Sequence, residues 1–163
     1  MTLEEHVASA PQVDESATRI VVPKELLAES FATMRRCGNG RRECQVLWIG
    51  PWTTPDVVTR VVHPRHRSFS GGYQVDDGWL NEFWVELARG KLGIRAQVHT
   101  HPHDAFHSSS DDTYPIIRTS GFLSLVIPDF AQGRIGLDAA YLAEVQPDGT
   151  WQSVDPASRI IIK

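Results

Sequence analysis

The residues best suited to chemistry gather in one polar stretch that begins at His99. Four of the seven histidines lie between His99 and His107. His99 and His101 form an H-x-H pair, and residues two apart in an extended segment point to the same side, so both imidazoles can bind one ion. Zinc binds imidazole nitrogen and, in catalytic sites, keeps one position open for water. The pair therefore predicts a hydrolytic metal site.

A carboxylate is needed to complete such a site, and two adjacent aspartates, Asp111 and Asp112, follow the turn at Pro102. Ser109 lies three residues before Asp112. If Ser109 caps a helix, both side chains can face the ion from its first turn. Asp111 would pair in the same way with Ser108, so the residues alone leave two candidate ligands.

Hydrolysis of an amide also needs a proton acceptor that does not bind the metal. Glu43 begins the apolar segment ECQVLWIG, where a charged residue needs a reason. In a strand beside the expected strand 94–98, it would reach the water at the metal. A solvated charge at the start of a strand is the alternative interpretation. Ser109 could donate a hydrogen bond to the tetrahedral oxyanion.

The pattern resembles that of the JAMM metalloproteases, also called JAB or catalytic MPN domains. Their motif joins an upstream Glu to H-x-H-P and S-x-x-D, and here it reads Glu43, HTHP at 99–102, Ser109 and Asp112. The similarity covers roughly residues 19–154, and the family spacing selects Asp112 over Asp111. The resemblance implies these roles: zinc ligands His99, His101 and Asp112, general acid/base Glu43, and oxyanion stabilisation by Ser109.

The same resemblance implies an isopeptidase or peptidase that cleaves after the C-terminus of a ubiquitin-like protein. It would process a precursor or remove the modifier from a lysine, in a bacterial conjugation or antiphage system. Processing of a ubiquitin-like sulfur carrier is an alternative. A non-catalytic MPN scaffold is an alternative from another class, although such scaffolds typically lack a ligand. Gln45, Trp48 and Ser108 depart from the family pattern and leave the shape of the substrate groove open.

Hydrophobic spacing predicts the elements that position these residues. We expect strands at 19–22, 43–50, 56–63, 94–98, 121–127, 135–145, 151–154 and 159–162. One helix should follow Pro23 and end at Gly38, and another should start at Asp76 or Asp77. Residues 65–74 read as a loop and 113–119 as a short helix. The order predicts a single mixed sheet flanked by helices, an α/β domain at 19–163 behind a flexible tail at 1–18. The resemblance implies a cytidine-deaminase-like, JAB-type MPN fold.

Composition restricts the class of protein further. The 163 residues are 41% hydrophobic and 22% charged, as is typical of globular proteins. A net charge of -4 argues against nucleic acid or an anionic membrane as partner. The N-terminus lacks the features of a secretory signal, so we expect a cytoplasmic protein. Cys37 and Cys44 are then expected to be reduced. His63 and His66 are expected to be ordinary histidines, and His107 an exposed loop residue.

Overall fold

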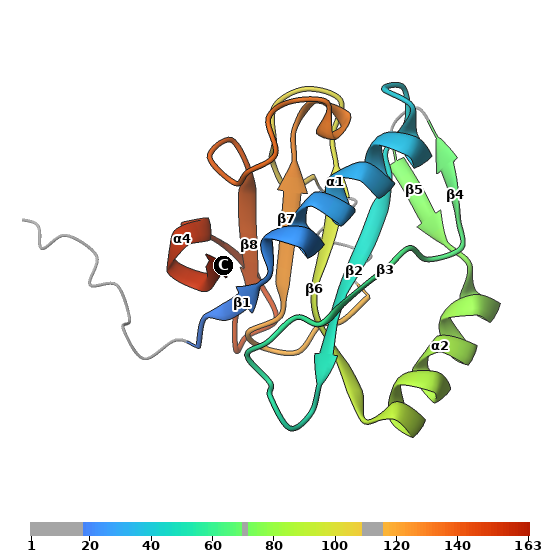
Figure 1. The fold of residues 1–163 in the computed structure, drawn as a ribbon, viewed down its shortest axis with the longest axis vertical. Coiled ribbons are helices and arrows are strands. Elements are labelled where there is room, and N and C mark those ends of the chain that lie inside the picture. Colours follow the sequence, from blue (N-terminus) through green and yellow to red (C-terminus); the bar gives the residue numbers. More distant parts are fainter. Residues whose placement is uncertain (1–17, 70–71, 109–115) are drawn as a thin grey trace, which may run out of the picture.

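A six-stranded mixed sheet forms the centre of the computed structural model, with strand order β3-β2-β6-β7-β8-β9 (Figure 1). The structure describes residues 18–69, 72–108 and 116–163. Strands β6 and β7 are parallel, and the other neighbouring pairs are antiparallel. The strands are β2 (Gln45–Pro51), β3 (Arg60–Val62), β6 (Leu92–Thr100), β7 (Leu123–Ile127), β8 (Tyr141–Val145) and β9 (Trp151–Val154).

Helices cover both faces of this sheet. Because side chains alternate along a strand, β2 sends Val46 and Trp48 to one face and Leu47 and Ile49 to the other. Helix α1 (Lys24–Gly38) packs on the first set and α2 (Asp77–Gly90) on the second. Figure 1 shows α1 crossing in front of the sheet. The predicted α/β fold, a mixed sheet flanked by helices, is confirmed.

Both long helices end at a glycine, α1 at Gly38 as expected, but the left-handed residue that caps each helix is the one after the glycine. Gly38 is the last residue of α1, and Asn39 adopts the left-handed conformation that ends it (φ 49°). Lys91 does the same after α2 (φ 53°). Asp76 caps the start of α2, since its carboxylate accepts a hydrogen bond from the Trp79 N–H (2.7 Å). Asparagine and lysine therefore take the positions where glycine is commonest.

The segment expected to be a loop contains a β-hairpin. Strands β4 (His66–Phe69) and β5 (Gly72–Val75) pair antiparallel, with His66 opposite Val75. Their polar residues and the nearby glycines had suggested an irregular connection. The expected strand at 56–63 is shorter, at Arg60–Val62. Residues 113–115 lie outside the described residues, and 116–119 are not helical.

The first and last strands pair with each other outside the main sheet. Strand β1 (Ile20–Val22) runs parallel to β10 (Ile160–Ile162), which follows the short helix α4 (Pro156–Arg159). The predicted strand at the end of the chain is therefore present, but it belongs to a separate two-stranded sheet. Backbone hydrogen bonds extend the pairing, with the Lys163 N–H donating to the Val22 carbonyl (3.1 Å).

A turn of left-handed backbone follows β7. Asp129, Phe130 and Ala131, the segment η1, have φ values of 53°, 53° and 61°. Such angles are unfavourable for residues other than glycine, by about 1–2 kcal/mol each. The Arg35 side chain on α1 donates to the carbonyls of Ala131 (2.5 Å) and Gly133 (2.6 Å). These contacts hold the strained turn against α1.

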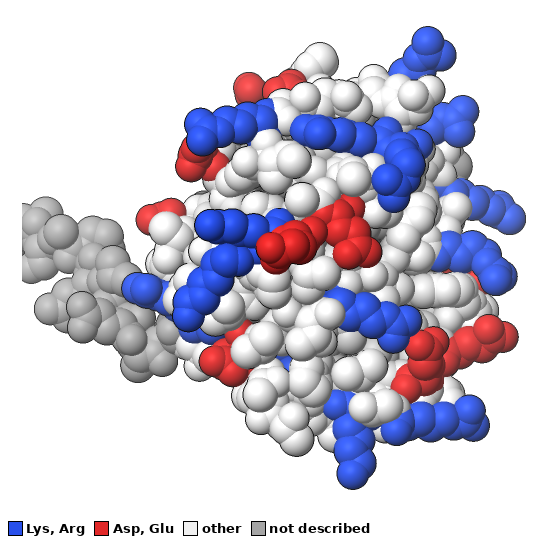
Figure 2. All heavy atoms as spheres, viewed as in Figure 1, with Lys and Arg blue, Asp and Glu red and all other residues white. Residues whose placement is uncertain are grey.

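Acidic and basic side chains are interspersed on the face that carries α1 (Figure 2). This mixed surface agrees with the modest net charge of -4. Within the described ranges, none of the helices has the length and apolar character needed to cross a bilayer.

Candidate metal site

The two histidines of the H-x-H pair lie where β6 ends. His99 is the second-last residue of β6, and His101 follows the strand. The His101 N–H donates to the Ile127 carbonyl at the end of β7 (3.0 Å), which keeps the segment extended beyond the strand. The exposed fractions are 0% for His99 and 2% for His101, and their ring centroids are 5.1 Å apart. The expected same-side arrangement of the imidazoles is present.

Strand register brings Glu43 to this pair. Gln45 on β2 lies opposite His99 on β6. The Thr100 N–H donates to the Cys44 carbonyl (3.0 Å), so the pairing continues one residue further. The next position places Glu43 opposite His101, and residues opposite each other in an antiparallel pair share a face.

The environment of Glu43 is enclosed. Its exposed fraction is 7%. The Ser68 hydroxyl on β4 donates to the Glu43 carbonyl (3.1 Å), so the β4–β5 hairpin fixes the backbone at this residue. A carboxylate kept from bulk water beside two imidazoles is suited to proton transfer. The alternative of a solvated charge does not describe this buried residue.

The other two members of the predicted constellation, Ser109 and Asp112, lie outside the described residues, as does Asp111. Their roles therefore stay predictions from the sequence. The described chain approaches them from Ser108 and resumes at Ile116, which packs near the α2 face of the sheet. This face also carries His99.

Aromatic side chains surround the two histidines. The ring of Tyr73 on β5 is 5.7 Å from that of His99, and Phe106 is 4.6 Å from His101, measured between centroids. His107 was expected to be exposed, but it is half-buried, with its ring 4.6 Å from that of Trp151. Its Nε2 is 3.2 Å from the Ser124 hydroxyl. The loop after His101 therefore folds back over the sheet.

The donor set suits a divalent ion such as zinc. Two buried imidazoles can supply nitrogen ligands, and Glu43 shares their face without lying on the same strand. Trp48, which departs from the family pattern, lies in the core on the opposite face of the sheet. Its indole N–H donates to the Ser30 hydroxyl (2.9 Å). Gln45, in contrast, is buried on the histidine face, beside His99.

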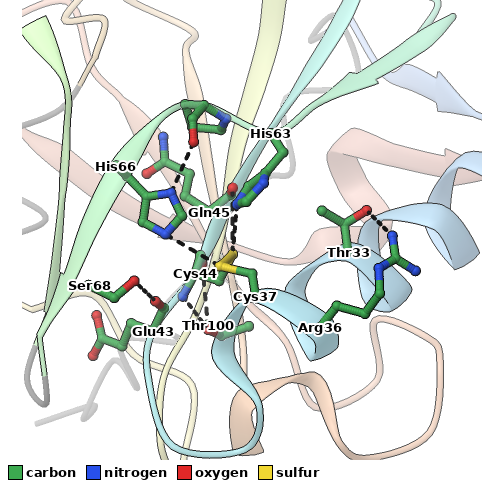
Figure 3. Close-up of a disulfide and its surroundings, with 11 residues drawn as sticks. Thr33, Arg36, Cys37, Glu43, Cys44, Gln45, His63, His66, Ser68 and Thr100 are labelled. Atoms are coloured by element: carbon green, nitrogen blue, oxygen red, sulfur yellow. Dashed lines mark hydrogen bonds between the residues drawn. A yellow bond between two sulfur atoms is a disulfide. The ribbon is translucent and has the colours of Figure 1, made fainter. Parts of the chain in front are cut away.

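The cysteines differ from expectation. Cys37 and Cys44, predicted to be reduced, form a disulfide with Cα atoms 6.0 Å apart. His63 and His66, expected to be ordinary histidines, each approach one of the sulfurs (Figure 3). Partial burial, followed by the nearby charges of His66 and Arg36, lowers the pKa of His63. Sequence reasoning missed this cluster, although the H-x-x-H spacing of the two histidines was a signal for it.

Solved structures with this architecture define the fold class. A protein from Desulfitobacterium hafniense superposes with a TM-score of 0.65 at 17% identity, over 88% of this chain and 92% of that one. A JAB1/MPN domain protein from Archaeoglobus fulgidus gives a TM-score of 0.50 at 11% identity, over 88% and 99%. At these identities the likeness concerns the fold, which is that of the JAB1/MPN domain.

A closer relative identifies the family. The chain is 33% identical over 150 residues to the probable metalloprotease y4jG of Sinorhizobium fredii, covering 88% of this chain and 91% of the relative. No family model matches the sequence. With the JAB1/MPN fold, this similarity shows that the chain belongs to the JAMM/MPN metalloprotease family. The protein is a metal-dependent hydrolase, a metallopeptidase of the JAMM type.

Proposed function

We propose that the protein is a zinc-dependent peptidase or isopeptidase that cleaves after the C-terminus of a ubiquitin-like protein. His99, His101 and Asp112 would hold the ion, and Glu43 would be the general acid/base. One observation carries the proposal: the buried Glu43 reaches the face of the two histidines through the β2–β6 register. A carboxylate buried on the same face as two imidazoles is placed to exchange protons with a water at an ion that they would hold.

The chemistry divides between the ion and the side chains. A zinc ion bound by these residues would act as a Lewis acid that activates water and polarises the scissile carbonyl. Glu43 would accept a proton from the attacking water and return it to the departing amine nitrogen. Ser109 would donate a hydrogen bond to the oxyanion. General acid/base catalysis of this kind contributes about 10²–10⁴-fold in rate.

The substrate class rests on the family resemblance and on the hairpin beside the histidines. Strand β5 pairs with β4 along one edge and carries Tyr73, whose ring is 5.7 Å from that of His99. An extended peptide can add to such a strand through main-chain hydrogen bonds. The small residues that end ubiquitin-like proteins would then pass Tyr73 and present the scissile bond to the histidines.

The test is cleavage of candidate ubiquitin-like proteins carrying either a C-terminal extension or an isopeptide-linked lysine peptide. We expect wild type to cleave and Glu43→Gln to lose at least about 100-fold in rate. Zinc content should stay unchanged in Glu43→Gln, because this residue is not a ligand. Glu82→Gln on the exposed side of α2 is the matched control and should retain wild-type activity.

The outcomes separate the alternatives. Equal rates for wild type and Glu43→Gln would refute the role of Glu43. If the enzyme cleaves only C-terminal extensions of ubiquitin-like sulfur carriers, its substrates are precursors of these carriers and not ubiquitin-like modifiers attached to other proteins. Binding of a partner without cleavage, in a protein free of zinc, would identify a scaffold instead of an enzyme.

A further inference from the structure

A second group of metal-binding side chains lies apart from the H-x-H pair. Cys37 lies near the end of α1, Cys44 directly precedes β2, His63 directly follows β3, and His66 begins β4. Their ligand atoms all lie within 4.8 Å of one another. Figure 3 shows both imidazoles directed at the sulfur pair. Residues from the end of α1, the start of β2 and the β3–β4 region thus bring two sulfur and two imidazole donors to one point.

The hydrogen bonding of His66 indicates its tautomer, and therefore whether the ring nitrogen next to the sulfurs carries a hydrogen or a lone pair. Nδ1 is 2.9 Å from the Pro64 carbonyl, which can only accept, so Nδ1 carries the hydrogen. In the neutral ring, Nε2 is then an acceptor, and it lies 3.3 Å from the Cys37 Sγ. A disulfide sulfur carries no hydrogen, so two electron-pair donors face each other there. A backbone carbonyl on the second ring nitrogen is the usual outer-shell arrangement of metal-bound histidine.

The spacing of the four donors fits a tetrahedral ion. With Zn–S of about 2.3 Å and Zn–N of about 2.0–2.1 Å, adjacent ligand atoms in a tetrahedron lie about 3.3–3.8 Å apart. The contacts His66 Nε2–Cys37 Sγ and His63 Nε2–Cys44 Sγ are both 3.3 Å. The sulfurs, bonded to each other in the disulfide, are the pair that must separate to admit the ion.

We propose that Cys37, Cys44, His63 and His66 form a zinc site when the two cysteines are reduced. The disulfide is the oxidised, metal-free form of the same four residues. Four protein ligands close the coordination sphere, so this site is structural, in contrast to the three-ligand catalytic arrangement. The ion would tie the end of α1 and the β3–β4 connection to Cys44, the residue after Glu43.

The two forms interconvert by a balanced exchange. A dithiol reductant gives two electrons and two protons to the Cys37–Cys44 bond and is itself oxidised to a disulfide. The two thiols lose their protons when they bind Zn²⁺, because the thiolate is the ligand. In the reverse direction, a peroxide ROOH accepts two electrons from the thiolates and two protons from the solvent to give water and an alcohol ROH, or two waters when R is hydrogen. The S–S bond then forms, and Zn²⁺ leaves.

Cobalt distinguishes this site from the catalytic one, because only sulfur ligation gives thiolate-to-cobalt charge-transfer absorption. The full-length protein, reduced with a dithiol, should bind Co²⁺ and develop this absorption. His99→Ala should retain the band, because the catalytic ligands include no sulfur. His66→Ala should weaken the band, Cys37→Ser should abolish it, and the exposed His103→Ala is the matched control. With Zn²⁺, reduced wild type should bind about one ion more than Cys37→Ser.

Peroxide treatment of the cobalt-loaded wild type should remove the band and release the metal, a readout that does not depend on a variant folding. Two titratable thiols without a cobalt–sulfur band would overturn the proposal. So would a band that persists unchanged in His66→Ala, or a disulfide that a dithiol leaves intact in metal-free protein. Failure of the catalytic zinc site is a separate result, in which wild type and His99→Ala hold equal amounts of zinc.

Discussion

Replacing Arg35 by alanine tests whether the left-handed turn after β7 is stabilised by a side chain from α1. The strain of Phe130 and Ala131 amounts to about 2–4 kcal/mol, and Asp129 adds less because aspartate adopts the left-handed conformation more readily. Arg35 offsets part of it through hydrogen bonds to the carbonyls of Ala131 (2.5 Å) and Gly133 (2.6 Å). Bonds from a charged donor contribute about 1.5–3 kcal/mol each, and less where exposed, as the second bond is.

We therefore expect Arg35→Ala to lower the free energy of unfolding by about 2–4 kcal/mol. In a domain of this length, that corresponds to a fall in Tm of roughly 5–15 °C. Urea unfolding followed by circular dichroism measures the first quantity, and calorimetry the second. Arg35→Lys keeps the charge but not the planar fork, so it should recover only part of the loss.

The adjacent Arg36 supplies the control. It is exposed, and among the described residues its guanidinium donates a hydrogen bond to the Thr33 hydroxyl on its own helix (3.4 Å), so Arg36→Ala should change the free energy of unfolding by less than about 0.5 kcal/mol. If Arg35→Ala also changes the free energy of unfolding by less than about 0.5 kcal/mol, the reasoning is refuted. The Phe130 N–H donates to the His101 carbonyl (2.9 Å), so Arg35→Ala should also weaken metal binding at the H-x-H pair.

Three further predictions concern the core and the sulfur cluster. Gly50→Ala should lower the free energy of unfolding by about 3 kcal/mol in urea, because its Cβ would lie 1.9 Å from the Val57 carbonyl oxygen. Ser30→Ala should lower it by about 1–3 kcal/mol, since the indole N–H of Trp48 loses its acceptor in the core. In the disulfide form, NMR titration should give His63 a pKa below 6.5. The folded state then binds fewer protons than the unfolded one, so this contribution to stability is present above pH 6.5 and is lost as the pH falls through the folded pKa.

Each of these has a contrary result. Gly38→Ala has open space around its Cβ, so a loss as large as that in Gly50→Ala would point to something other than the close contact. Ser30→Ala with wild-type stability would mean that Trp48 finds another acceptor. A His63 pKa above 6.5 would contradict the burial and the like charges that surround this ring.

Period and spacing were sufficient to predict several of the elements on which the site depends, although not the β4–β5 hairpin. The apolar stripe of α1, the strand that delivers His99 and the same-side placement of His101 follow from repeats of 3.6 and two residues. Glu43 was placed through the family's motif, and the β2–β6 register supports that placement. The metal-ligand roles stay predictions, because Ser109 and Asp112 lie outside the described residues.

What the sequence did not predict depends on contacts between distant segments. Asp129, Phe130 and Ala131 contain no glycine to indicate positive φ, and their conformation relies on Arg35, almost a hundred residues earlier. Neither the Cys37–Cys44 pair nor the His63–His66 pair predicts a metal site by itself, and the four side chains form one group only because the fold brings them together. Short polar strands such as β4 and β5 are hidden for a similar reason, since pairing rather than hydrophobic alternation defines them.

The pairing of β1 with β10 affects when this protein can finish folding. The two strands are 140 residues apart in the chain, and Ile20 and Ile160 both belong to the main core. At about 5–20 residues per second, a ribosome needs on the order of 10–30 s to make the intervening chain. Throughout that time, the edge of β1 that pairs with β10 has no strand beside it. The opposite edge can already form hydrogen bonds with residues 56–58. Strand β1 is therefore made long before its pairing with β10 can be completed.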